Sequence, residues 1–126
     1  MRSWLKSTIK PLLPEVVRDN IIEVSKVSST YSSGVVKDGQ TTTDDVWIPS
    51  DHEVGFGTTY ETTGPVYSSK FNSNANRIKN NSSGTASYWW LRSAHNSTYF
   101  RCVNSSGANN NSSASYAYGV ALGFCL

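Results

Sequence analysis

The sequence predicts an α+β domain, because its helix signals come first and its strand signals come last. Two amphipathic helical patterns occupy residues 2–10 and 14–21. Three runs rich in strand-forming residues lie near 87–91, 99–103 and 119–126, and they can pair as an antiparallel sheet joined by short turns. The prediction is therefore two short helices packed on a small, mostly antiparallel sheet, with long irregular loops.

Length and composition indicate one domain, residues 1–126, with an aromatic core. The hydrophobic fraction is only 37%, but four Trp and seven Tyr provide large rings to bury. The net charge of +2 comes with scattered basic residues, so neither nucleic acid nor an anionic membrane is expected as a partner. No apolar run reaches the roughly 20 residues of a membrane span, so membrane insertion is not expected.

The first helix has Trp4, Leu5 and Ile9 on one face, and Pro11 ends it. The second helix begins with a proline and an acidic residue, as helix first turns often do.

The middle of the chain mixes short strands with irregular segments. Residues 22–27 predict a half-buried strand, and residues 28–45 predict an exposed loop or a long hairpin connection. A short strand follows at 46–48, and residues 58–83 predict a long irregular segment. Its three cations are expected to be solvated rather than to form a phosphate site, because no Gly-rich turn into a helix accompanies them; they are Lys70, Arg77 and Lys79.

A capping box is predicted between the two irregular segments, with Ser50 as N-cap and Glu53 three residues later. A short helix should then begin at Asp51 and end by the glycines at 55 and 57. His52 and Glu53 can also be read as an acid–base pair, but capping explains Glu53 without chemistry.

The strongest strand contains Trp89 and Trp90, which point to opposite faces if the strand is regular, so both faces must be covered. Arg92 is expected to pair with Glu53 or Asp51. Trp89 or Trp90 should form the core together with Trp47 and Phe124. Cys102 and Cys125 are expected to be buried free thiols, with a disulfide or a metal site as weaker alternatives.

Residues 95–118 have the composition of a contact surface. They include five Asn, six Ser and three Tyr, with Arg101 as the only formal charge. Tyr offers a large rigid contact area, and Asn and Ser offer adaptable hydrogen bonds, as in antibody paratopes. A low-complexity loop is the alternative interpretation.

A depletion of residue types accompanies this composition. Lys, Glu, Gln, Met and Trp supply 16 of the first 92 residues and none of the last 34. These five types cannot be reached from a pyrimidine-ending Asn codon when its adenines are replaced. The pattern therefore fits adenine-directed mutagenesis, although a simple Asn and Ser bias gives the same result.

Four segments carry a family resemblance: 46–54 (VWIPSDHEV), 77–79 (RIK), 89–94 (WWLRSA) and 118–126 (YGVALGFCL). They resemble the DUF6273 group of C-type-lectin-like domains of Firmicutes and their phages. Members resemble the variable proteins of diversity-generating retroelements, whose C-terminal segment is rewritten at Asn codons. The resemblance implies a C-type-lectin-like fold, a mixed sheet with two packed helices, and a variable ligand-binding segment at 95–118.

The resemblance also implies which residues bind and which support. The candidate ligand-binding residues are His95, Asn96, Tyr99, Arg101, Asn104, Asn109, Asn110, Tyr116 and Tyr118. The expected scaffold residues are Phe100, Val103, Gly119, Val120 and Phe124. Phe100 and Val103 are three positions apart, so in a regular strand their side chains point to opposite faces, and burying both on one face requires a bulge. Family members usually carry a further strand before the first helix, so a trimmed N-terminus or a neighbouring chain over the open edge is expected.

No cofactor and no metal are expected. Calcium sites need clustered oxygen ligands, and residues 93–126 contain neither an acid nor a Glu-Pro-Asn or Gln-Pro-Asp motif. The formylglycine-generating enzymes share a related fold, but Cys102 and Cys125 do not reproduce their cysteine arrangement.

The expected function is a non-enzymatic module that binds a protein or glycan receptor on a cell surface. It would be displayed on a virion or bacterial cell surface, as a homo-oligomer or attached to a larger protein. The alternatives are a catalytic relative of the formylglycine-generating-enzyme fold and a purely structural virion domain.

Overall fold

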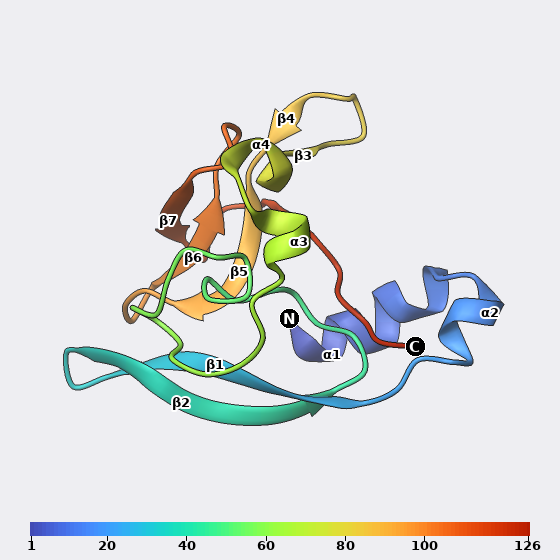
Figure 1. Ribbon diagram of the computed structural model, residues 1–126, viewed down its shortest axis with the longest axis horizontal. Coiled ribbons are helices and arrows are strands. Elements are labelled where there is room, and N and C mark those ends of the chain that lie inside the picture. Colours follow the sequence, from blue (N-terminus) through green and yellow to red (C-terminus); the bar gives the residue numbers. More distant parts are fainter.

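The computed structural model describes residues 1–126, except for the side chain of Asp38. It confirms the α+β class, with short helices and mostly antiparallel strands. In Figure 1 the N-terminal helical segment and a long hairpin lie on one side, and the main sheet and two further helices lie on the other. The α-helices are α1 (Arg2–Trp4), α2 (Glu15–Arg18), α3 (Ser68–Phe71) and α4 (Asn74–Arg77). The strands are β1 (Val24–Ser32), β2 (Val35–Asp44), β3 (Lys79–Asn80), β4 (Ala86–Ser87), β5 (Trp89–Ala94), β6 (Tyr99–Val103), β7 (Asn109–Ser113) and β8 (Gly119–Val120).

Both predicted N-terminal helices are present in shorter or altered form. Helix α1 continues directly into a π-helical stretch, Leu5–Ile9, and a 3-10 turn, Lys10–Leu12. Leu5 is buried but its neighbour Trp4 is 42% exposed, so Leu5 anchors this segment. Pro11 lies at the start of the 3-10 turn, where a missing N–H is tolerated, rather than after the helix.

Strands β1 and β2 form an antiparallel hairpin. Ser33 and Gly34 both have positive φ, as the two central residues of a type I′ hairpin turn require. The expectation of a loop over 28–45 is therefore corrected, because most of that segment is paired strand. In β1 only Lys26 and Ser29 are buried, so the hairpin lacks the apolar alternation that identifies a half-buried strand.

The main sheet has the strand order β7-β6-β5-β8. The β5–β6 pair is antiparallel, as expected, but β8 pairs with β5 in parallel, and a further antiparallel strand, β7, pairs with β6. Strand β7 was not predicted, because Asn109–Ser113 contains only polar residues. Isolated bridges join Ile22 to Cys125 and Trp47 to Gly123, and they attach the last residues to the rest of the fold.

Strand β5 has a core cluster on each face, as its adjacent tryptophans predict. Trp90 packs with Leu5, Val46, Ile48 and Cys102, and Trp89 packs with Val54, Leu91 and Val103.

Two predicted scaffold aromatics lie outside this core. Phe124 is 36% exposed and Phe100 is 39% exposed, whereas Trp47 is buried. The bulge expected between Phe100 and Val103 is wrong, because Phe100 is not buried and β6 pairs with β7 in unbroken register. A register shift occurs instead in β5, between Trp90 and Ala94.

Replacing Trp89, which is 1% exposed, by Ala is expected to lower the free energy of unfolding by about 3–5 kcal/mol. Phe124→Ala should cost much less, because part of that ring already contacts solvent. Urea denaturation of both variants measures the difference, with Trp4→Ala as an exposed-tryptophan control and Trp89→Phe as a milder core variant. Equal losses for Phe124→Ala and Trp89→Ala would contradict this description of the core.

Candidate functional site

The turn that follows Pro49 contains the predicted capping box. The Ser50 main-chain N–H donates to Glu53 Oε2 over 3.1 Å, and the Glu53 N–H donates to Ser50 Oγ over 3.1 Å. The predicted helix is wrong, because residues 51–55 form only hydrogen-bonded turns. Gly55 has a φ of 82°, a left-handed conformation that ends the turn.

The buried Glu53 carboxylate joins three parts of the chain. It accepts hydrogen bonds from Lys26 Nζ in β1, over 3.1 Å, and from Arg92 Nη1 in β5, over 2.5 Å. The Arg92–Glu53 pair confirms one of the two predicted partners. Arg92 also donates to the carbonyls of Val27 and Ile48, so each of its three guanidinium nitrogens has a partner within the fold.

The pKa of Glu53 is lowered even though the group is buried. Burial alone would raise the pKa, but the hydrogen bond and charge of Arg92, the charge of Lys26 and the Ser50 N–H together outweigh it. The carboxylate is therefore ionised near neutral pH and holds both cations.

A second buried ion pair lies beside the first. Arg101 Nε donates to Asp51 Oδ2 over 2.9 Å, and both side chains are buried. The Asp51 N–H donates to Ser93 Oγ, which donates to Glu61, and Glu61 also accepts the main-chain N–H of Ser29. Burial raises the pKa of Asp51 despite the opposing effect of Arg101. Arg101 was expected to bind ligand, but its side chain is buried and lies beneath the predicted ligand face. It is held there because the buried Asp51 carboxylate needs a cation.

His95 is connected to this layer through Tyr60. The Arg101 guanidinium lies 4.7 Å from the centre of the Tyr60 ring, a cation–π distance. The Tyr60 hydroxyl and His95 Nδ1 share a hydrogen bond of 2.7 Å. Sequence reasoning missed this contact, because Tyr60 lies 35 positions from His95, within the predicted irregular segment 58–83.

The exposed part of the predicted face is formed by aromatic and amide side chains. Tyr99 is 40% exposed and Tyr116 is 58% exposed. Asn109 is exposed and Asn110 is half-buried, both on the edge strand β7. These positions contribute no side chain to either core cluster.

Asn96 and Asn104 have a local structural role. Asn96 Oδ1 accepts the main-chain N–H groups of Thr98 and Tyr99, and Asn104 Oδ1 accepts those of Ser106 and Ala108. Such bonds stabilise tight turns. Both residues shape the loops of the face through their side-chain oxygens.

Tyr118 links the face to the core. Its ring stacks on Tyr116 at 5.7 Å, with 5° between the planes, and it also packs against Trp90 and Tyr88. Its hydroxyl shares a hydrogen bond with Ser112 Oγ. Tyr118 is half-buried, so it supports the exposed Tyr116 ring.

Two sequence expectations about single residues have different outcomes. Cys102 and Cys125 are both free thiols, as expected, but only Cys102 is buried and Cys125 is half-buried. Burial raises the pKa of the Cys102 thiol, which makes it a poor nucleophile. Arg77 is not a solvated cation: it is buried, donates to the Val54 carbonyl over 2.7 Å and lies over the Phe56 ring. Lys70 and Lys79 are exposed.

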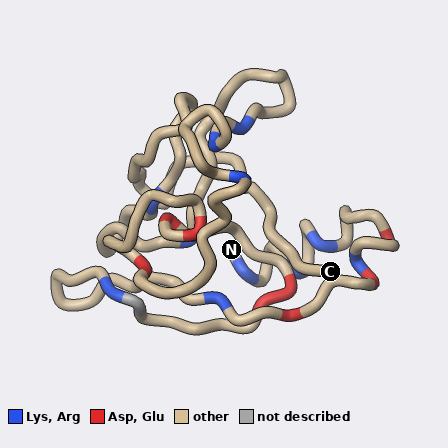
Figure 2. Tube along the Cα trace, in the orientation of Figure 1, with Lys and Arg blue, Asp and Glu red and all other residues tan. Residues whose placement is uncertain are grey.

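The charged and titratable side chains that the structure describes form no further cluster. Figure 2 shows Lys and Arg positions distributed along the whole trace rather than gathered in one region. No three His, Cys, Asp or Glu residues within the described part of the chain are arranged to hold a metal ion. Over the same residues, no helix has the length and apolar character needed to span a bilayer.

The fold and the site define a small α+β domain that carries an aromatic and amide surface on a scaffold of buried ion pairs. The chain belongs to the family described as Domain of unknown function (DUF6273), whose model matches residues 1–126, and this confirms the family indicated by the sequence motifs. No curated protein and no solved structure gives a significant match.

Arg101→Ala is expected to destabilise the fold by about 3–5 kcal/mol, because it leaves the buried Asp51 without its cation. Tyr116→Ala and Asn109→Ala should change the free energy of unfolding by about 0.5 kcal/mol or less, as exposed substitutions usually do. Chemical denaturation of the three variants measures both effects. A loss with Tyr116→Ala as large as that with Arg101→Ala would show that the face is part of the core.

Proposed function

We propose that this chain is a non-enzymatic binding module with a C-type-lectin-like fold. Residues 95–118 bind a protein or glycan receptor on a cell surface. The module is displayed on a virion or bacterial surface protein, as part of a larger protein or as a homo-oligomer. Its binding segment is diversified as in the variable proteins of diversity-generating retroelements.

The observation that carries this proposal is the separation of exposed and buried groups in one short segment. Arg101 and Cys102 of β6 are buried, whereas Tyr99 and Tyr116 are exposed. Tyr116 stacks on Tyr118, which holds an exposed ring in place, and Tyr is enriched at interface hot spots. The stability of the fold therefore depends on the buried residues of this segment, and recognition of the receptor depends on its exposed tyrosines.

The depletion of five residue types in the last 34 residues supports the diversification part of the proposal. Asn109, Asn110 and Asn111 lie on the edge strand β7, where substitutions alter the surface without removing a core contact. A face with this arrangement tolerates changes of side chain.

The test is saturable binding of the fluorescently labelled protein to intact cells of a panel of Firmicutes strains, measured by flow cytometry. At least one strain should bind, and the double variant Tyr99→Ala/Tyr116→Ala should weaken that binding by roughly 30-fold or more, as expected for aromatic hot spots. Val16→Ala on α2, where Val16 is 73% exposed, is the matched control and should bind like the unchanged protein.

Two results would contradict the proposal. One is the absence of saturable binding to every strain, and the other is equal binding by the double variant and the Val16→Ala control.

A further inference from the structure

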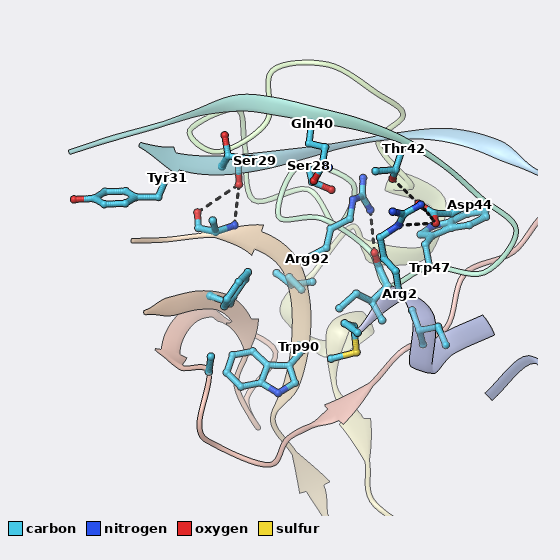
Figure 3. Close-up of a pocket in the computed structure, with 18 of the residues that line it drawn as sticks. Arg2, Ser28, Ser29, Tyr31, Gln40, Thr42, Asp44, Trp47, Trp90 and Arg92 are labelled. Carbon is cyan, nitrogen blue, oxygen red and sulfur yellow. Dashed lines mark hydrogen bonds and ion pairs between the residues drawn. The ribbon is translucent and has the colours of Figure 1, made fainter. Parts of the chain in front are cut away.

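A groove of about 640 Å³ lies between the β1–β2 hairpin, α1 and strand β5. Figure 3 shows the hairpin on one side of it, with Ser28, Gln40 and Thr42, and Trp90 on the opposite side. The volume lies within the roughly 300–1,000 Å³ of typical ligand pockets. Four residues of the 95–118 segment line it, so the groove adjoins the proposed binding face; they are Asn96, Ser97, Phe100 and Ala114.

The Arg and Asp side chains that line the groove are already paired. Arg2 donates to Asp44 over 2.8 Å and to the Thr43 carbonyl, and Asp44 also accepts the Thr42 hydroxyl. Arg92 is used by Glu53 and by main-chain carbonyls. The charges of these groups are compensated within the fold, so the groove favours a neutral ligand.

The hydrogen-bonding groups that remain unused in the groove are neutral. Ser28, Thr30 and Gln40 make no side-chain hydrogen bond to any other residue that the structure describes, and all three line the groove from the hairpin. The opposite wall is apolar, and the ring it exposes is that of Phe100, which is 39% exposed, whereas Trp90 and Leu91 in the same wall are buried. One wall therefore offers hydroxyl and amide groups, and the other offers aromatic surface.

From this arrangement we infer that the groove binds a neutral glycan. A sugar ring has an apolar face that packs on an aromatic ring and hydroxyls that donate to and accept from Ser, Thr and Gln. A wholly apolar ligand, such as an acyl chain, would cover the polar wall and leave its groups without partners. This inference rests on the proposed function and specifies its receptor as a glycan.

The test is binding to an array of printed oligosaccharides, with neutral hexoses and N-acetylhexosamines on some spots and uronic and sialic acids on others. Neutral glycans should bind, and their binding should be unchanged between roughly 50 and 500 mM NaCl, because the ligand itself carries no charge for salt to screen. Gln40→Ala should weaken binding about fivefold, the effect of one lost hydrogen bond. Phe100→Ala should weaken it about tenfold.

Thr41→Ala is the matched control, since Thr41 is exposed on the same strand as Gln40 but does not line the groove. The inference is overturned if no glycan binds, if only acidic glycans bind in a salt-dependent way, or if Gln40→Ala and Phe100→Ala bind like Thr41→Ala. If the array gives no signal while cell binding still depends on Tyr99 and Tyr116, the groove inference fails and the proposed function stands. If neither the glycan array nor the cells give a binding signal, both the groove inference and the proposed function are rejected.

Discussion

The structure depends on one buried carboxylate. Glu53 is 1% exposed, and an ionised carboxylate in that environment needs compensating charge and hydrogen bonds. Lys26 from the hairpin, Arg92 from β5 and the Ser50 N–H supply them. Because these three groups come from distant parts of the chain, satisfying Glu53 fixes the hairpin, the 50–55 turn and the main sheet relative to one another.

The hairpin is attached to the sheet by polar contacts. The two buried side chains of β1 are Lys26, which reaches Glu53, and Ser29, whose hydroxyl accepts the Ala94 N–H over 2.9 Å. The Ser29 N–H donates to the buried Glu61. Polar docking leaves space between hairpin and sheet, which is where the groove lies.

How far the sequence predicts this structure depends on whether a feature is encoded locally. Adjacent Trp89 and Trp90 predicted two covered faces correctly, because side-chain alternation along a strand is a local property. The capping box was also local and correct, but the helix it usually precedes is absent, because Glu53 serves a tertiary pair and Gly55 turns the chain. The start of β1 was predicted as a strand over 22–27, but the rest of β1 and the strands β2 and β7 were missed, because they bury few apolar side chains and so lack a hydrophobic period.

The candidate site was predicted in outline only. The aromatic and amide composition located the exposed face, including Tyr99 and Tyr116. The position of Arg101 could not be predicted, because its partner Asp51 lies 50 positions away and charge pairing has no sequence period. The position of the hairpin beside the sheet was missed for the same reason. It is set by the Lys26–Glu53 pair, whose members are 27 positions apart in the sequence.

The most direct test of this account is amide hydrogen exchange of Glu53→Gln, compared with Glu15→Gln in the first turn of α2. Gln keeps the shape of the side chain but removes the charge that Lys26 and Arg92 share. If Glu53 fixes the hairpin, protection of the β1 and β2 amides should fall more than about tenfold relative to those of β6 and β7, and Glu15→Gln should leave the pattern unchanged. Unchanged protection in the hairpin, or an equal fall in all strands, would contradict the claim that this carboxylate positions the hairpin.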